Sequence, residues 1–578
     1  MTEDDRHARE AYRQTGKTIP GQYEGGNHHD HIPPTGWAHG RTGSMVAKEE
    51  EMLKTITVRK MGLAIASGLM LTGSFPAANL SSLSWFALVP LFIAMRDLSA
   101  KDSFRIGLLT GCIHYLSLMY WLAYTMQTYG GLPPWVSIPV LFLLAIYLGL
   151  YLAAFSAASS RFLTTPLRLL VFGPLLWVSV EYLRSFLFTG LPWCLLGYCQ
   201  HNNLHLIQIS DIFGVYGVSY VIVFANVVGF LAIQHIVGRE WQFKAVNRWL
   251  VGGGIISLAF LTGMAWGYGR WRIDAMDRQI AEAPTKRISI VQGNIDQAKK
   301  WDLEFRTATT EIYADLSQSA KPERPDLVVW PETATPFYYG NDPRLTRRVR
   351  KAIGRVGTDF LIGSPSFLRK KEDVTYYNSA YLIDGYGRTT GKYDKAHLVP
   401  FGEYVPFKKW LPFLGKIVAH VGDFTAGEKG KTLLWGDVRL GVQICYEIIF
   451  PNLSAAMVLN QASYIVNITN DAWYGKTSAP YQHFAIARFR AIENRRSLIR
   501  AANTGISGFV DPVGRIIGAS DIFQEAVLTQ AMPIINEETV YTRWGDVFAQ
   551  ICLMITLLLF LRETVARATS KKRTGGKS

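Results

Sequence analysis

Residues 441–451 read GVQICYEIIFP. The apolar run Val442–Ile444 is typical of a buried strand, and Cys445 stands where it ends, followed at once by Tyr446 and Glu447. Taken alone, this cysteine is explained as core packing, because free cysteine is among the most buried residue types. The end of an apolar strand is also a common place for a catalytic group at a sheet edge. The rest of the chain has to decide between these interpretations.

Cys445 is the only thiol in segment 285–540, so no disulfide can form within that segment. The cysteine spacing is not that of a zinc site. We interpret His28, His29 and His31 as part of a solvated N-terminal tail rather than as metal ligands, and we expect neither a metal nor a cofactor. The cysteines of the chain are Cys112, Cys194, Cys199, Cys445 and Cys552, and all but Cys445 lie in or beside apolar stretches.

The composition is typical of a membrane protein with a soluble part attached. Of the 578 residues, 49% are hydrophobic and only 18% are charged, and the mean hydropathy is +0.11. Globular chains have about 25% charged residues. Apolar stretches of roughly 20 residues, enough to cross a hydrocarbon core of about 30 Å, lie near 61–79, 82–97, 106–126, 135–158, 167–187, 212–236, 249–269 and 546–561. The sequence therefore predicts about eight transmembrane helices.

The positive charges predict the topology. A net charge of +15 would suit a nucleic-acid binder, but the positive residues gather beside apolar stretches and no nucleic-acid motif accompanies them. By the positive-inside rule, both termini are cytoplasmic and the soluble segment lies on the outer face. We expect a disordered tail over 1–58, seven transmembrane helices in 59–272, a soluble domain over 285–540, an eighth helix over 545–562 and a basic tail over 563–578.

Three ionisable residues, Glu181, Arg184 and Asp211, fall near the outer ends of predicted spans. Ionisable residues at membrane depth are costly and often functional. The other interpretation is a mutual pair of Glu181 and Arg184, three residues apart at the membrane interface. The sequence leaves both interpretations open.

The soluble segment alternates short apolar runs with helical ones. Strands are expected over 287–295, 326–332, 359–367, 377–384, 438–445, 463–471 and 505–512, and helices over 343–356, 452–461 and 480–497. Asp384-Gly385 and the run 511–514 (DPVG) are turn signals. Buried strands mixed with helices predict a layered α/β domain.

Three motifs follow one another in this segment: WPE (330–332) and CYE (445–447) stand at the ends of predicted strands, and KAHLVPFGE (395–403) lies between them. Their order resembles that of the nitrilase superfamily, which implies an αββα sandwich and a Glu-Lys-Cys triad. Further stretches make the chain similar to the bacterial apolipoprotein N-acyltransferases over about residues 60–565, among them VQGNIDQAKKWD (291–302), NITNDAWYG (467–475) and GLPWCLLGY (190–198).

The resemblance implies roles for individual residues. The triad is Glu332, Lys395 and Cys445, and Glu403 matches a further carboxylate of the superfamily site. Tyr446 and Glu447 match residues that the family needs beside its nucleophile. We assign a set of aromatic residues to the acyl-chain entrance, with ordinary packing or interfacial anchoring as the alternative interpretation. They are Trp301, Trp410, Trp473, Tyr474 and Phe484.

The implied activity is transfer of an acyl chain from a membrane phospholipid to the α-amino group of the N-terminal diacylglyceryl-cysteine of apolipoproteins, by a ping-pong mechanism through a thioester on Cys445. The implied partners are the phospholipid donor, the apolipoprotein acceptor and the bilayer, without nucleic acid. The implied location is the bacterial inner membrane, with the catalytic domain facing the periplasm.

Three other functions are compatible with parts of the sequence. A membrane-tethered nitrilase-type amidase acting on small amides would use the same triad. A transporter or channel with an outer binding domain is disfavoured, because no repeated halves are evident. A pseudoenzyme that serves as a scaffold is disfavoured, because all three triad positions are present with their flanking residues.

Overall fold

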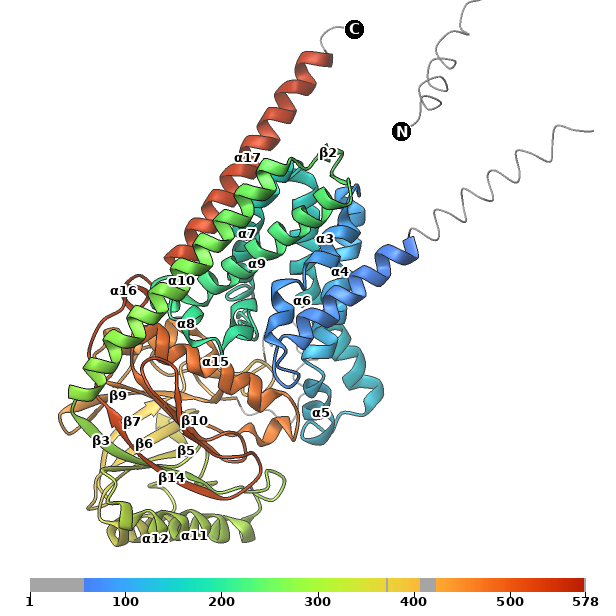
Figure 1. Cartoon of the computed structure of the whole chain (residues 1–578). Helices are drawn as coiled ribbons and strands as arrows, with labels where there is room; N and C mark the ends of the chain where they lie inside the picture. Colours follow the sequence, from blue (N-terminus) through green and yellow to red (C-terminus); the bar gives the residue numbers. More distant parts are fainter. Residues whose placement is uncertain (1–56, 371–372, 406–422, 576–578) are drawn as a thin grey trace, which may run out of the picture. The chain divides into compact units, whose positions relative to one another are not determined.

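The computed structural model describes residues 57–370, 373–405 and 423–575 (Figure 1). The expected disordered tail over 1–58 lies almost entirely outside these residues, and so does Trp410. Within them, helices occupy 57–282 and 540–575, apart from the short strands β1 (Glu240–Trp241) and β2 (Lys244–Ala245), and an α/β part lies between.

Two six-stranded sheets form the α/β part. The first, in spatial order, contains β14 (Ala526–Pro533), β3 (Thr285–Gln292), β4 (Leu327–Val329), β5 (Asp359–Lys370), β6 (Asp373–Ile383) and β7 (Thr389–Asp394). The second contains β13 (Ile516–Ala519), β12 (Gly508–Val510), β11 (Ser497–Ala502), β10 (Tyr464–Thr469), β9 (Val438–Ile444) and β8 (Leu433–Trp435). The central strands β3–β5 and β9–β11 run parallel. Parallel strands covered on both faces have near-continuous apolar sequences, and β10 and β11 are buried at every residue.

The helices of this part cover the sheets. They include α11 (Leu303–Ser319), α12 (Pro343–Val356), α14 (Pro451–Leu459) and α15 (Ala479–Asn494), with the short turns η4 (Cys445–Ile449) and η5 (Asp471–Tyr474). The layered α/β fold and each expected strand and helix are confirmed within a few residues. The expected helix 480–497 ends earlier, because Arg495 adopts a left-handed conformation (φ 48°) and Ser497 already begins β11. The sequence analysis missed α11 and the strands β7, β8, β11, β13 and β14.

In the helical part, fewer of the described helices reach the length and hydropathy of a membrane span than expected. Its elements are a helix over 57–73, η1 (Ser81–Trp85), α3 (Val89–Met95), α4 (Ala100–Leu118), α5 (Trp121–Thr128), α6 (Pro134–Phe162), α7 (Pro166–Arg184), η2 (Leu196–Gln200), α8 (Leu204–Ile207), α9 (Ser210–Ile236), α10 (Arg248–Glu282), α16 (Val540–Trp544) and α17 (Val547–Gly575).

Five helices among the described residues are long and apolar enough to cross a membrane: α6, α7, α9, α10 and the 547–569 stretch of α17. The pair α4–α5, bent by 53°, raises the number to six if it counts as one span. The expectation of about eight is therefore too high by this measure. Ser81–Met95 is a shorter apolar helical stretch that does not reach the length of a span. The structure describes the first expected span only from residue 57 onward.

The candidate spans differ in how much of their apolar surface the protein covers. The most apolar window of α9 is 78% buried, whereas those of α10 and α17 are only 11% and 17% buried. Ile256 and Phe260 on α10 and Leu557 on α17 are exposed. A helix that leaves apolar side chains uncovered suits a lipid environment. We therefore place α9 inside the bundle and α10 and α17 on its lipid-facing side.

Glycines allow α4 and α6 to pack closely. A Cβ atom added to Gly111 would lie 2.5 Å from the Cα atom of Gly149. Because this Cα atom belongs to the backbone of α6, the two helices would have to move apart to make room. Small residues at such crossings let helix backbones approach each other in membranes. By contrast, a Cβ atom on Gly263 of α10 would meet nothing within 4 Å.

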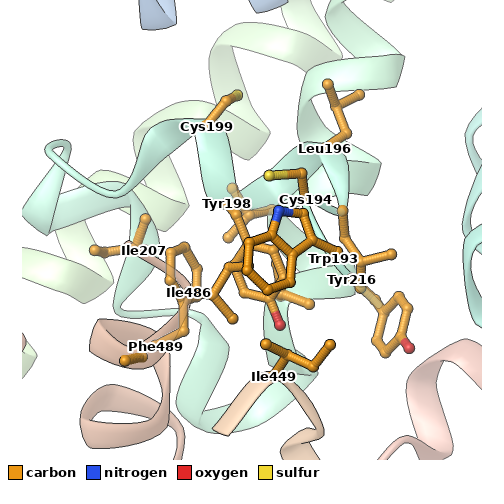
Figure 2. Close-up of a cluster of buried hydrophobic side chains, with 14 of the residues drawn as sticks. Trp193, Cys194, Leu196, Tyr198, Cys199, Ile207, Tyr216, Ile449, Ile486 and Phe489 are labelled. Carbon is orange, nitrogen blue, oxygen red and sulfur yellow. The ribbon is translucent and has the colours of Figure 1, made fainter. Parts of the chain in front are cut away.

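Buried charges and apolar side chains join the helical part to the α/β part. Asp211 accepts hydrogen bonds from Arg272 of α10 (2.8 Å) and from Arg495 at the end of α15 (2.7 Å). Figure 2 shows Ile449, Ile486 and Phe489 of the α/β part beside side chains of segment 193–216, in one buried cluster. Asp211 therefore has a structural role, because it holds two elements of the junction together.

Glu181 and Arg184 hold the loop that follows α7. Glu181 Oε1 accepts a hydrogen bond from the Leu196 amide (2.7 Å), and the Arg184 guanidinium donates to the carbonyl oxygens of Trp193 (3.2 Å) and Cys194 (3.4 Å). The two side chains therefore fix the loop 193–196, which packs against the α/β part.

We expect Gly111→Val to lower the free energy of unfolding by about 1–3 kcal/mol, because overpacking forces the α4 and α6 backbones apart. Thermal unfolding of the purified protein in detergent measures the effect. Gly263→Val is the matched control, since its side chain would project into open space. Equal melting temperatures for the two variants would contradict close packing at Gly111.

Candidate active site

The ends of three strands bring Glu332, Lys395 and Cys445 into one buried site. Glu332 follows β4, Lys395 follows β7 of the same sheet, and Cys445 follows β9 of the other sheet. The exposed fractions of these residues are 6%, 1% and 6%, respectively. The site therefore lies between the two sheets, away from bulk water.

Two carboxylates surround the Lys395 ammonium. Its Nζ atom lies 2.9 Å from Glu403 Oε2 and 3.7 Å from Glu332 Oε1. Burial lowers the pKa of Lys395, but the charges of Glu403 and Glu332 outweigh burial and hold the pKa above its ordinary value. Asn378 of β6 donates hydrogen bonds from Nδ2 to Glu332 Oε1 (2.8 Å) and Glu403 Oε1 (2.9 Å). One amide group thus bridges the two carboxylates. Lys395 is therefore a fixed cation at neutral pH.

The second oxygen of Glu332 is held from the other sheet. Its Oε2 atom accepts a hydrogen bond from the Asn470 backbone amide (3.0 Å), at the end of β10. Lys300, a fully buried lysine, donates from Nζ to the Glu332 carbonyl oxygen (3.3 Å). Burial lowers the pKa of Lys300 to about 8, against the opposing charge of Glu332. Both the backbone and the carboxylate of Glu332 are thus fixed.

Cys445 occupies a strained turn. Its φ of 53° is in the left-handed region, which costs a non-glycine residue about 1–2 kcal/mol. Asn467 of β10 donates from Nδ2 to the carbonyl oxygens of Gln443 (3.0 Å) and Cys445 (3.4 Å), and Arg500 donates to the Asn467 side-chain oxygen. Strained residues of this kind persist where their surroundings fix them, and they cluster at functional sites.

Burial raises the pKa of the Cys445 thiol to about 12, with the Glu332 charge adding to the rise and the Lys395 charge opposing it. The thiol is therefore protonated at neutral pH. Because the thiolate is the nucleophilic form, attack by Cys445 needs a base to take the proton, and Glu332 is the carboxylate whose charge acts most strongly on it.

Glu447 connects the segments that carry Lys395 and Cys445. Its Oε1 atom accepts hydrogen bonds from the backbone amides of Ala396 (2.7 Å) and His397 (3.0 Å), and its Oε2 atom accepts from the Ile444 amide (2.7 Å). Burial raises its pKa to about 7 although these donors favour the carboxylate. Glu447 is fully buried and does not act as a surface charge.

Tyr446, Trp473 and Tyr474 contact the helical part of the protein. The Tyr446 hydroxyl donates to the Gly190 carbonyl oxygen (3.4 Å). The Tyr474 ring packs edge-on against Trp121 of α5, with ring centroids 4.8 Å apart, and the Trp473 ring packs against Tyr129 at 5.1 Å. Trp301 is 44% exposed, and Phe484 is buried on α15. The structure thus brings Tyr474 and Trp473 to the junction, while Trp301 is exposed and Phe484 is buried away from solvent.

Sequence reasoning missed the residues that support the site. These are Asn378, Lys300, Asn467, Asn470 and Arg500. Asn467 interrupts the apolar run of β10, Asn378 lies in the mixed strand β6, and Arg500 is a charged residue inside the fully buried strand β11. A buried polar side chain needs a partner, and this is the one signal that pointed to them. Among the described residues, no group of three or more His, Cys, Asp or Glu side chains is arranged to hold a metal ion.

In the Glu332→Gln variant, which lacks the carboxylate beside the thiol, we expect alkylation of Cys445 by iodoacetamide to accelerate about tenfold per pH unit up to about pH 9, since only the thiolate reacts. Mass spectrometry of the Cys445 peptide measures the rate, and Cys445→Ala is the control for background labelling. A rate that levels off below about pH 8 would contradict a thiol pKa raised by burial.

Comparison with known proteins identifies both parts of the chain. Residues 67–228 match the apolipoprotein N-acyltransferase N-terminal domain, and residues 287–535 match the carbon-nitrogen hydrolase family. An apolipoprotein N-acyltransferase of Geobacter metallireducens is 43% identical over 511 residues, which cover 87% of this chain and 96% of that protein. One of Methylococcus capsulatus is 32% identical over 85% of this chain and 93% of that protein.

Among solved structures, an amidase from Nesterenkonia sp. matches 46% of this chain and 95% of its own length, at 19% identity and a TM-score of 0.34. Both relatives are more than 30% identical to this chain and match more than four fifths of it, which shows its family. The chain belongs to the apolipoprotein N-acyltransferase family.

Proposed function

We propose that this protein transfers an acyl chain from a membrane phospholipid to the α-amino group of the diacylglyceryl-cysteine at the N-terminus of apolipoproteins, through a thioester on Cys445. The observation that carries the proposal is a buried lysine held between Glu403 and Glu332, beside a cysteine in a left-handed turn. Glu332, Lys395 and Cys445 form the catalytic triad.

In the first half-reaction, Glu332 takes the proton of the Cys445 thiol while Sγ attacks the ester carbonyl carbon of the phospholipid. The C–S bond forms, the ester C–O bond breaks, and Glu332 returns the proton to the departing oxygen. A lysophospholipid leaves, and Cys445 carries the acyl chain as a thioester. The neutral resting thiol fits this role, because the base and the nucleophile exchange one proton.

Lys395 stabilises the oxyanion of the tetrahedral intermediate. Its ammonium is charged at neutral pH and is already surrounded by carboxylates, so that little reorganisation is needed during the reaction. The backbone N–H of Tyr446 is the second donor. Glu403 positions Lys395 and keeps it charged, and Glu447 positions both Lys395 and Cys445 through the backbone amides on either side.

In the second half-reaction, the α-amine of the acceptor attacks the thioester carbon. Glu332 takes a proton from the amine, the C–S bond breaks as the amide C–N bond forms, and the proton passes to the departing sulfur. Cys445 is then a thiol again, and the acceptor leaves with a third acyl chain.

The helical part supplies the setting for two lipid substrates. Both the donor and the acceptor reside in the bilayer, so a site joined to membrane helices avoids extracting either one. Trp301, Trp473 and Tyr474 are the substrate-contacting aromatics of this proposal, in keeping with the place of aromatic residues at membrane interfaces. The charges flanking the apolar stretches favour a bacterial inner-membrane protein with the α/β part in the periplasm and both termini in the cytoplasm.

We expect Cys445→Ala to abolish the acyl-enzyme and to lower acyl transfer by about 10³-fold or more, because no other group can form the thioester. Intact-protein mass spectrometry after incubation with phospholipid detects the acyl adduct. Cys552→Ala, which removes a buried thiol from α17, is the matched control and should retain the adduct. An adduct on the Cys445→Ala protein, or hydrolysis of small amides without acyl transfer, would contradict the proposal.

We expect Glu447→Gln to lower the rate constant of acyl-enzyme formation at least about tenfold. The two carboxylate oxygens of Glu447 accept hydrogen bonds from backbone amides, whereas a glutamine side chain has only one acceptor oxygen. A buried N–H group left without an acceptor costs about 1–3 kcal/mol. Glu311→Gln on the exposed face of α11 is the control. A Glu447→Gln protein that forms the acyl-enzyme at the parent rate would show that this carboxylate does not position the site.

A further inference from the structure

Helix α5 lies against loop 473–478, which comprises the last two residues of η5 and the four that follow, although the two segments are more than 340 residues apart in sequence. The Thr125 hydroxyl donates to the Trp473 carbonyl oxygen (2.8 Å), and the Tyr120 hydroxyl accepts a hydrogen bond from the Ser478 amide (3.2 Å). The chain reaches this position because α5 is bent by 53° away from α4. The helix therefore holds both sides of the loop 473–478 by polar contacts.

Aromatic packing fixes the same loop. Trp121 and Tyr129, at the two ends of α5, pack edge-on against Tyr474 and Trp473, with centroid distances of 4.8 and 5.1 Å. Gly475 has a φ of 62°, and a Cβ atom there would overlap the Tyr124 ring. The backbone of the loop thus passes directly over α5, at a residue where only glycine fits both the conformation and the space.

The other end of this segment holds the catalytic carboxylate. Asn470, immediately before η5, donates its backbone amide to Glu332 Oε2 (3.0 Å) and its side chain to Gln297 (2.5 Å). Asp471 is fully buried and accepts a hydrogen bond from Arg500 (2.7 Å). Its pKa is lowered to about 2, because the Arg500 and His483 charges outweigh burial. From Asn470 to Ser478 the chain is therefore anchored at both ends.

We propose that α5 is a positioning element for the catalytic base: by fixing loop 473–478 through Thr125, it sets the Asn470 amide that orients the Glu332 carboxylate. The proposal rests on the proposed function of Glu332. No atom of Thr125 reaches the reacting groups, so it acts through the loop and is a positioning residue.

The consequence is that a helix of the membrane part sets the geometry of the chemistry in the α/β part. Tyr120 and Tyr124 are exposed on α5, and Trp135 at the start of α6 is 77% exposed. Exposed aromatic residues at the ends of spans are typical of the membrane–water interface. The element that seats the enzyme at the lipid surface is thus also the element that aligns its base.

The test compares Thr125→Val, which removes the hydroxyl with little change of shape, with Thr125→Ser, which keeps it. Thr262→Val is the matched control, because the Thr262 hydroxyl on α10 bonds only to carbonyls of its own helix in the described structure. Each full-length protein is reconstituted in phospholipid vesicles, and the single-turnover rate of acyl-enzyme formation on Cys445 is measured over a range of phospholipid fractions, together with the melting temperature.

We expect Thr125→Val to lower the saturating rate constant by about threefold to tenfold, the effect of one lost hydrogen bond on a positioned group, with the half-saturating phospholipid fraction unchanged. Thr125→Ser and Thr262→Val should both remain within about twofold of the parent. A purely structural role would lower the melting temperature and leave the rate per folded enzyme unchanged.

The outcomes separate the two proposals. If the parent forms an acyl-enzyme and Thr125→Val forms it at the same saturating rate, or loses only phospholipid affinity, α5 does not position the base. If the parent forms no acyl-enzyme on Cys445, the proposed function itself fails, and Glu332 is not a base for α5 to position.

Discussion

The structure of the site depends on one buried cation. Lys395 is 1% exposed, and an ammonium removed from water is stable only if opposite charges lie close to it. Glu403 and Glu332 supply these charges, and Asn378 keeps the two carboxylates apart at hydrogen-bonding distance. The same arrangement that makes the lysine tolerable in the interior leaves it charged, as its proposed role of stabilising an oxyanion requires.

The cation and the nucleophile come from different sheets, so a further contact has to set their separation. Glu447 provides it by accepting backbone amides next to Lys395 and next to Cys445. On the far side, Asn467 and Arg500 fix the left-handed turn at Cys445. These contacts hold the three strand ends in one fixed arrangement. The proposed mechanism needs such an arrangement, because reacting groups have to be oriented before the reaction.

Much of this could be predicted from the sequence, and the remainder could not for physical reasons. Cys445 and Glu332 stand at the ends of apolar runs, a local pattern that is visible in a single sequence. Lys395 follows the polar strand β7, and only the resemblance to a known family pointed to it. Asn378 and Arg500 act across strands far apart in the chain, and their partners follow only from the pairing of the sheets. Among the described residues, five helices, or six with the bent pair α4–α5, have the length and hydropathy of a span, against about eight expected. Hydropathy alone does not reveal that the helical stretch Ser81–Met95 is short or that α4 and α5 are bent.

The junction between the two parts explains why the nitrilase-type site is joined to membrane helices. Asp211, Arg495 and the apolar cluster around Trp193 fix the α/β part on the helical bundle, as the proposed transfer between two membrane lipids requires. The central claim is acyl transfer from phospholipid to a lipoprotein amine. Mass spectrometry of a lipoprotein N-terminus after incubation with this protein and phospholipid carrying a labelled acyl chain tests it most directly. The account predicts the label on the α-amine with one lysophospholipid released per transfer, and a free α-amine with the label recovered only as free fatty acid would contradict it.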